Sequence, residues 1–291
     1  MSDADPKLPH RGHELLDVLA RLGGSARNAQ IAQVMDVSEE TVRRLVKTLA
    51  KQSKVERVHG GTYLRGSQDA PMYSGALEQQ PKEKTRIAKG VLELIHDGMT
   101  LFINVGSTTT YVAEQLRERR DLTVVTNSIS TVASLAEHNG SRVFLAGGEV
   151  SRSERGCFGR ATEEFARQFA FDALVIGADA LSPELGVLAA NPREADLTRA
   201  LLGNASRVIV AADFRKFTAL APCIAAPLEA VTDLVTDAAP PDALQDALDR
   251  CGVATHLAAK SGRITTRTPP PRDKGHSNTN HKTLTIPTEV S

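Results

Sequence analysis

The sequence predicts an α/β protein with two domains: a small winged helix-turn-helix at the N-terminal end and a larger, mostly parallel α/β domain after it. Its 291 residues are enough for about two domains. Three helical patterns and a Gly-Gly hairpin fill residues 8–65, whereas short apolar runs alternate with helical patterns over residues 81–259. Such alternation is typical of a parallel sheet that helices cover on both faces.

The first domain begins with two helical patterns. Residues 10–22 carry aliphatic side chains on one stripe, and a Gly-Gly pair ends that helix. Residues 29–35 predict a short second helix, whose inward side chains are expected to be Ile31, Val34 and Met35. A tight turn then leads to the third helix, which is the arrangement of a helix-turn-helix.

The third helix is the one expected to enter the major groove of DNA. Ser38 is a good N-cap, because its hydroxyl can accept a hydrogen bond from a free backbone N–H of the first turn. The buried face of this helix is expected to consist of Val42, Leu45, Val46 and Leu49. Its other face is basic, since seven lysines and arginines lie between Arg43 and Arg65 against one acidic residue, Glu56.

Residues 55–65 predict two short strands around Gly60-Gly61, since Gly-Gly supplies the positive φ angles of a two-residue hairpin. This hairpin would be the wing. Arginine can bind guanine bidentately and lysine mostly neutralises phosphate, so the polar and basic residues of the third helix and wing are the candidate DNA contacts. They are Ser38, Thr41, Arg43, Arg44, Lys47, Thr48, Lys51, Arg57, His59, Gly60 and Gly61. The alternative is a solvated basic face in a protein-binding module.

Two segments lack a periodic apolar pattern. Residues 66–80 are rich in Gly, Ser, Pro and Gln and predict a linker. Residues 260–291 contain proline, threonine and basic residues and predict a disordered tail.

The larger domain is expected to contain six helices and seven strands. The helices are predicted at 82–96, 108–118, 129–138, 162–168, 194–204 and 241–250. The strands are predicted at 100–105, 122–126, 142–146, 171–176, 207–212, 230–236 and 253–257.

Polar, glycine-rich loops follow five of these strands. Ligands of open α/β sheets bind beyond the carboxyl ends of the strands, so these loops are expected to converge on a ligand. The loop that opens with Gly106 is the most informative, because its hydroxyls and the free N–H groups of the next helix can bind a phosphate. Threonines also cap many helices without binding anything. The candidate effector residues are Asn104, Gly106, Ser107, Thr108, Thr109, Thr126, Asn127, Gly147, Gly148, Glu149, Arg152, Gly177, Asp179, Asp213 and Lys216.

The segment SEETVRRLVKTLAKQSKVERVHGGTYL resembles the DNA-binding head of the DeoR family of bacterial regulators. The stretches GSTTTYVAEQL, LTVVTNS, VFLAGGEV, FDALVIGADAL, NPREA and ADFRKF resemble that family's sensor domain, in the same order. The resemblance implies a fold similar to ribose-5-phosphate isomerase, an oligomer, and a repressor that a phosphorylated sugar releases from DNA. It also adds Glu194 to the candidate effector residues.

The sequence departs from the family pattern at a few positions. Leu45 stands where the family has an aspartate after its arginine pair, which affects the expected operator contacts. Asn104 replaces an aspartate in the phosphate-loop motif, and Thr198-Arg199 replace a common lysine. The pocket is therefore expected to prefer a different effector or to use different hydroxyl contacts.

Composition limits the other possibilities. No apolar stretch approaches the roughly 18 residues of a membrane span, and the acidic N-terminus does not resemble a signal peptide, so a cytoplasmic location is expected. The three cysteines lack metal or disulfide spacing, and neither a metal nor a cofactor is expected. Residues 1–65 carry 11 basic and 8 acidic side chains, and this excess favours a nucleic-acid partner.

These observations predict a DNA-binding transcriptional regulator rather than an enzyme. The predicted partners are double-stranded operator DNA, a small-molecule effector and further copies of the chain. One alternative is a sugar-phosphate isomerase with an accessory DNA-binding head, although the amide of Asn104 cannot act as a general base. Another is a constitutive architectural protein with a degenerate pocket.

Overall fold

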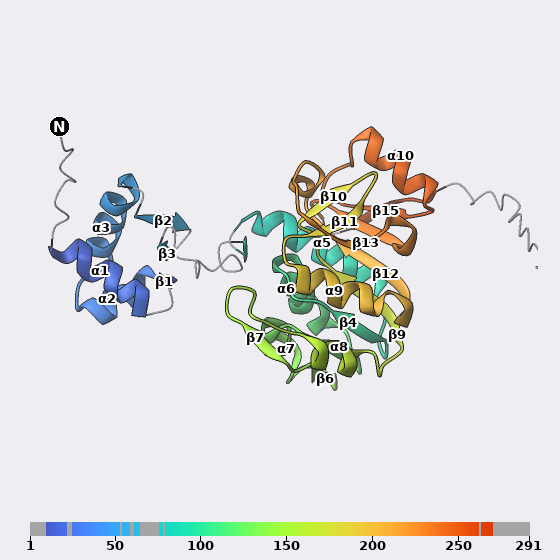
Figure 1. Cartoon of the computed structure of the whole chain (residues 1–291), viewed down its shortest axis with the longest axis horizontal. Helices are drawn as coiled ribbons and strands as arrows, with labels where there is room; N and C mark the ends of the chain where they lie inside the picture. The colour runs from blue at the N-terminus through green and yellow to red at the C-terminus, as the bar shows by residue number, and fades with distance from the viewer. Residues whose placement is uncertain are drawn as a thin grey trace, which may run out of the picture.

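The computed structural model describes residues 10–21, 25–52, 54–58, 61–64, 76–77, 79–261 and 263–269 (Figure 1). Within these residues the chain forms an N-terminal head of helices and short strands, and a larger α/β domain with a large sheet, called here the sensor domain after the family that the sequence resembles. No helix of the described residues is long and apolar enough to cross a lipid bilayer.

The head consists of three helices and a three-stranded antiparallel sheet. The helices are α1 (His10–Arg21), α2 (Asn28–Met35) and α3 (Glu39–Lys51). The strands, in sheet order, are β1 (Ser25–Arg27), β3 (Gly61–Leu64) and β2 (Val55–Val58). The predicted winged helix-turn-helix is therefore confirmed, whereas β1 was not predicted, because three residues between two helices show no periodic pattern.

The core of the head joins the inner faces of its three helices. On α3 the side chains of Val42, Val46 and Leu49 are buried, and Leu45 is half-buried against them. The prediction for α2 was wrong at Val34, which is 50 % exposed. Ala32 is buried in place of Val34, together with Ile31 and Met35, because the helix packs a different stripe of side chains against the core.

The sensor domain is built on an eight-stranded sheet with the order β16-β15-β14-β12-β9-β4-β5-β6. All neighbours from β15 to β6 pair in parallel, and only β16 is antiparallel. The strands are β4 (Thr100–Ile103), β5 (Thr123–Thr126), β6 (Arg142–Leu145), β9 (Phe171–Ile176), β12 (Ala205–Ala211), β14 (Asp233–Thr236), β15 (Ala254–Ala258) and β16 (Ile264–Arg267). The predicted mostly parallel α/β fold is confirmed.

Helices cover both faces of this sheet. They are α5 (Pro81–Leu94), α6 (Ser107–Gln115), α7 (Ile129–Leu135), α8 (Arg160–Ala166), α9 (Pro192–Leu201) and α10 (Asp242–Arg250). Successive strand residues point to opposite faces, so Phe102 packs in one apolar cluster with α9 and α10, whereas Leu101 and Ile103 pack in the other with α5 and α6. This burial on both sides explains the continuous apolar strands in the sequence.

Several short strands were not predicted. β10 (Ala180–Ser182), β11 (Gly186–Ala189) and β13 (Cys223–Ala226) form a small antiparallel sheet, and β7 (Glu149–Ser151) and β8 (Gly156–Phe158) form a hairpin. β16 lies inside the segment predicted to be a disordered tail. That prediction was wrong for residues 264–267, because pairing with β15 orders a segment that has no apolar stripe of its own.

Candidate functional site

A cavity of about 130 Å³ lies beyond the carboxyl ends of β4 and β9. These two strands are neighbours, and the chain continues from β4 toward β5 on one side and from β9 toward β12 on the other. This is the topological switch point of the sheet, where open α/β folds bind ligands. The lining residues are Ala76, Val105, Gly106, Ser107, Thr108, Glu154, Gly177, Ala178, Asp179, Ala190, Glu194 and Lys216.

One wall of the cavity is the start of helix α6. Gly106 is the N-cap, and a Cβ atom there would come within 2.9 Å of the Thr109 hydroxyl oxygen, so glycine allows the tight entry. Thr109 and Thr110 use their hydroxyls to bond the loop itself, both donating to the Gly106 carbonyl. Thr108 differs, because its side chain is 6 % exposed, lines the cavity and has no hydrogen-bond partner among the described residues. Its hydroxyl can therefore bond a ligand in the cavity as donor or acceptor.

The opposite wall carries three carboxyl groups and one ammonium. Lys216 lies 3.8 Å from the Asp179 carboxylate, which also accepts a hydrogen bond from the Ala190 backbone N–H at 2.7 Å. Burial, followed by the charges of Asp179 and Glu154, raises the pKa of Glu194 to about 8. Burial and Asp179 also raise the pKa of Glu154. Glu194 is therefore mostly protonated at neutral pH and can donate a hydrogen bond to a ligand.

Asn104 sits behind this wall and orients Glu194. Its amide nitrogen donates to the Glu194 carboxyl group at 3.1 Å, and its amide oxygen accepts from the Gly177 backbone N–H at 3.1 Å. An aspartate at this position would place a second carboxylate against Glu194, and the two groups could not both ionise at this distance. With asparagine instead of aspartate at position 104, Glu194 has one ionisable neighbour fewer in the pocket.

We expect Glu194→Gln to stabilise the protein at alkaline pH and to have little effect at acidic pH. A carboxyl whose pKa is raised on folding contributes stability below its unfolded pKa of 4.5, and this contribution is lost as the pH rises through about 8. Glutamine does not titrate, so the variant escapes that loss. The difference in free energy of unfolding between variant and wild type, called here the stability gap, should grow by roughly 2–4 kcal/mol from pH 5 to pH 9, since one pKa unit corresponds to about 1.4 kcal/mol.

Thermal or urea unfolding of the ligand-free protein at both pH values measures this gap. Glu93→Gln is the matched control, because Glu93 is exposed on α5. A gap that stays constant between pH 5 and pH 9 would contradict the assignment of a protonated Glu194.

Seven of the candidate effector residues predicted from the sequence line the cavity. They are Gly106, Ser107, Thr108, Gly177, Asp179, Glu194 and Lys216. Asn104 is adjacent, through its bond to Glu194. The other lining residues were not predicted from the sequence. They are Ala76, Val105, Glu154, Ala178 and Ala190. Glu154 carries no signal in the sequence, because it reaches the cavity only through the turn between β7 and β8.

The remaining candidates lie outside the cavity lining. They are Thr109, Thr126, Asn127, Gly147, Gly148, Glu149, Arg152 and Asp213. Asn127 is fully buried and supports the site from behind, because its side-chain oxygen accepts from the Val105 backbone N–H at 2.9 Å. Glu149 forms an ion pair with Arg193 at 3.1 Å on the surface.

Asp213 is buried and binds Arg215 bidentately, with both N–O distances 2.8 Å. Burial alone would raise the pKa of Asp213, but the hydrogen bonds and charge of Arg215 outweigh it and lower the pKa. This carboxylate therefore positions the loop that carries Lys216.

The second candidate surface is the outer face of α3. The Ser38 hydroxyl accepts a hydrogen bond from the Thr41 backbone N–H at 3.2 Å and caps the helix. Arg43 pairs with Glu39 and Glu40 at 3.3 and 3.5 Å. The side chains of Arg44, Lys47, Thr48 and Lys51 are exposed along the same helix.

The wing is described only in part. Arg57 lies in β2 and Gly61 in β3, and these strands pair in antiparallel register. The structure places no side chain for Arg57, and His59 and Gly60 lie outside the described residues. Their predicted contacts with DNA stay predictions.

Comparison with known families gives two matches. Residues 11–68 match the family model of a DeoR-like helix-turn-helix domain, and residues 79–238 match that of the DeoR C-terminal sensor domain. The glycerol-3-phosphate regulon repressor of Escherichia coli (strain K12) is 31 % identical over 236 residues, which are 81 % of this chain and 94 % of that protein. The transcriptional repressor GlcR of Bacillus subtilis (strain 168) is 32 % identical over 225 residues, which are 77 % and 86 %.

Solved structures match more distantly. Translation initiation factor eIF-2B of Pyrococcus horikoshii OT3 is 17 % identical with a TM-score of 0.39, and the match covers 78 % of this chain and 95 % of that one. Ribose 5-phosphate isomerase A of Methanocaldococcus jannaschii is 16 % identical with a TM-score of 0.34, and the match covers 46 % and 52 %. The fold assignment therefore rests on the strand order described above.

Proposed function

The chain belongs to the DeoR family of DNA-binding transcriptional regulators, and from this premise we propose that it represses a carbohydrate catabolic operon until a phosphorylated sugar or related metabolite binds its sensor domain. The names of its relatives support this function, because they are repressors of a glycerol-3-phosphate regulon and of the aga operon, among others. Operator DNA and a small phosphorylated effector are the proposed partners.

The main support for the proposal is that one cavity combines groups able to bind a phosphate with groups able to bind the hydroxyls of a sugar. The start of α6 offers backbone N–H groups and the hydroxyl of Thr108, which bonds no other described residue, and Lys216 lines the same cavity. Helix N-termini with hydroxyls and an ammonium bind phosphate groups. Glu154, Asp179 and Glu194 can bind the hydroxyls of a sugar, since carboxyl groups accept and, when protonated, donate hydrogen bonds.

The test uses the full chain and an operator selected from random duplexes. Specific binding should weaken as salt increases, with a log–log slope of about −0.9 for each phosphate contact. A panel of phosphorylated sugars and polyols should contain a member that raises the melting temperature and releases the operator. A ligand at about 100 times its Kd adds about 2.7 kcal/mol of stability. Absence of DNA binding even at low salt would overturn the proposal.

We expect Lys216→Met to weaken effector binding by about 10- to 100-fold and to leave operator affinity unchanged. The reason is that a hydrogen bond to a charged group contributes about 1.5–3 kcal/mol, and methionine keeps the length of the side chain without the charge. Calorimetric titration of the active sugar phosphate measures the change. Lys260→Met is the matched control, because Lys260 is exposed and outside the cavity. Equal losses in both variants would contradict the role of Lys216.

An enzymatic function is the second candidate, because Glu194 has a pKa near 8 in a cavity, as many catalytic acids do. We favour a non-enzymatic sensor, since the named relatives are repressors. Turnover of ribose 5-phosphate or a similar aldose phosphate by the full chain, lost in Glu194→Gln, would favour the isomerase instead.

The proposal includes a homo-oligomer in the cytoplasm. A two-fold dimer places two heads on the half-sites of an inverted repeat, which explains how a short recognition helix can specify an operator. Sedimentation of the chain with and without operator DNA measures its oligomeric state.

A further inference from the structure

Lys84 on α5 is a buried cation whose direct partners are neutral. Its side chain is 1 % exposed, and its ammonium donates hydrogen bonds to the backbone carbonyls of Ala76 and Gln79. Among the described residues no carboxylate lies within 4 Å of this ammonium, and the nearby Asp213 is already bound to Arg215. Burial lowers the pKa of Lys84 to about 8, although the charge of Asp213 opposes this effect. Among the described residues, these two carbonyls are therefore the hydrogen-bond partners of the ammonium.

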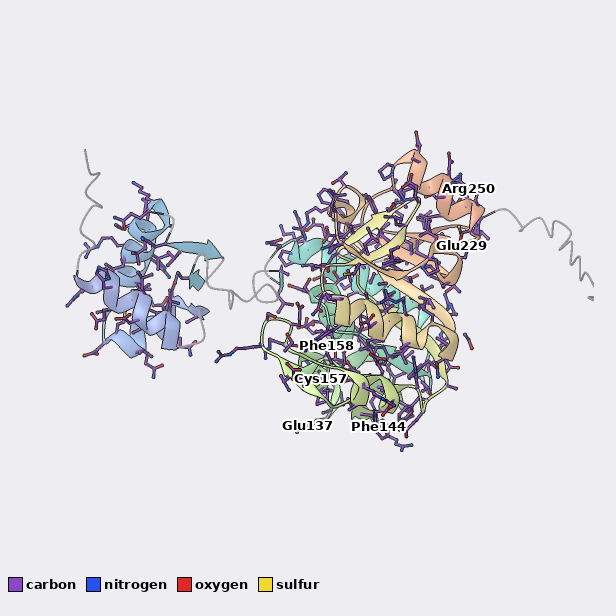
Figure 2. The ribbon with its side chains drawn as sticks, viewed as in Figure 1. Glu137, Phe144, Cys157, Phe158, Glu229 and Arg250 are labelled. Carbon is purple, nitrogen blue, oxygen red and sulfur yellow. The ribbon has the colours of Figure 1, made fainter. Side chains whose placement is uncertain are left out.

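The described residues just before α5, which are Ala76, Leu77 and Gln79, are called here the latch segment. Tyr111 of α6 donates a hydrogen bond to the Leu77 carbonyl at 3.1 Å, and Arg215 donates to the Gln79 side chain at 2.9 Å. Leu77 also packs against Val105 and Phe158, which is labelled in Figure 2. Both hydrogen-bond donors come from elements at the cavity. Tyr111 belongs to α6, whose first turn lines the cavity, and Arg215 directly precedes the lining residue Lys216.

The latch segment also belongs to the cavity, because Ala76 is one of its lining residues. In the chain this segment lies between the head match, which ends at residue 68, and α5, which begins at Pro81. The other lining residues lie at the ends of strands, in the first turns of helices and in the turn between β7 and β8, whereas the latch segment belongs to no sheet.

The cavity is small for the proposed effector. Its volume of about 130 Å³ is below the roughly 300 Å³ at which pockets for small ligands begin. One wall must therefore move before the cavity can enclose a sugar phosphate. The latch segment is held by side-chain hydrogen bonds and by the packing of Leu77, so its displacement breaks no pairing of the sheet.

We propose that the latch segment is a displaceable wall of the effector cavity, held closed by Lys84, and that entry of the effector releases it. This inference rests on the proposed function for the identity of the ligand. A ligand that fits only the released arrangement shifts the equilibrium toward it, as a conformational switch requires. Lys84 is a positioning residue in this scheme.

Hydrogen–deuterium exchange of the full-length protein, followed in the peptide that covers residues 76–82, tests the latch. Lys84→Met should accelerate exchange in this peptide by about tenfold or more, because the hydrogen bonds to a charged donor are lost. Lys89→Met, an exposed position on the same helix, should leave it unchanged. Exchange in the peptide that covers β9 should also stay unchanged, which separates local release from global unfolding.

The second arm adds ribose 5-phosphate, glycerol 3-phosphate or glucose 6-phosphate, chosen by its effect on melting temperature. The bound ligand should accelerate exchange at residues 76–82 in the wild type, slow it at the start of α6, and cause no further acceleration in Lys84→Met.

Slower or unchanged exchange at residues 76–82 with a stabilising ligand would overturn the displaceable wall. Unchanged exchange in Lys84→Met would overturn the latch itself. If none of the three compounds stabilises the protein, the proposed effector class fails while the Lys84→Met arm still decides the latch. Should Lys84→Met not fold, Tyr111→Phe removes the hydroxyl that donates to the Leu77 carbonyl and should give a smaller acceleration in the same peptide.

Discussion

Replacing Asp233 with alanine is expected to lower the free energy of unfolding of the sensor domain by about 2–4 kcal/mol, because it leaves the charge of Arg207, whose side chain is 34 % exposed, without its buried partner. Asp233 is 4 % exposed. Arg207 of β12 donates two hydrogen bonds to its carboxylate, at 2.7 and 3.1 Å, and His256 of β15 lies 2.8 Å from it. One carboxylate thus joins three neighbouring strands.

The same network determines how the loss depends on pH. Burial alone would raise the pKa of Asp233, but the hydrogen bonds from His256, Arg207 and Thr232 outweigh it and lower the pKa to about 2. A depressed carboxyl pKa contributes stability above the unfolded value of 3.8, and this contribution is lost as the pH falls through about 2. The difference between Asp233→Ala and wild type should therefore shrink in strong acid.

Urea unfolding at neutral pH measures the effect. Asp246→Ala is the control, because Asp246 is exposed on α10, and surface substitutions of this kind usually change stability by less than about 0.5 kcal/mol. A loss below about 1 kcal/mol in Asp233→Ala would mean that solvent replaces the lost partner and that the network is not needed for stability.

Arg44→Ala is expected to weaken operator binding by about 1–3 kcal/mol, or roughly 5- to 150-fold, if the guanidinium binds a base bidentately. Arg44 is exposed on α3. Its neighbour Arg43 already pairs with Glu39 and Glu40, so it must give up these ion pairs before it can contact DNA. We therefore expect a smaller loss for Arg43→Ala than for Arg44→Ala.

Fluorescence anisotropy with the selected operator, and with variants of it at single positions, measures both losses. A base contact relaxes specificity at one position, whereas a phosphate contact weakens all sequences equally and reduces the salt slope by about 0.9. Lys89→Ala on α5 is the control outside the head. Unchanged affinity in Arg44→Ala would remove this residue from the DNA interface.

The long elements could be predicted from the sequence because each has its own periodic pattern. The strands of the large sheet are apolar runs, and α3 has a cap at Ser38 and an apolar stripe. The missed strands, such as β1 and β16, have three or four residues each and are ordered by pairing with another strand rather than by a pattern of their own. His256 and Thr266 illustrate this, since their hydrogen bond across β15 and β16 has no local signal.

The candidate site could be predicted in part, because the ends of β4 and β9 meet at the switch point of the sheet. The loops after β5 and β6 were included on the expectation that five strand ends converge. The strand order places β5 and β6 progressively farther from β9, and residues such as Thr126 and Glu149 lie outside the cavity lining. Ala76 and Lys84 could not be found, because an alanine and a helical lysine carry no functional signal until the fold brings them together.

The pairing of β16 with β15 also bears on where this protein can be shortened. β16 lies beyond residue 238, where the match to the sensor-domain family model ends, and beyond residue 259, where the sequence places the end of the domain. A chain cut at either point would leave the backbone N–H and C=O groups of Ala254–Ala258 or Asp233–Thr236 open to solvent. Such an edge can pair with a strand of another molecule, so shortened forms should self-associate more than the full chain.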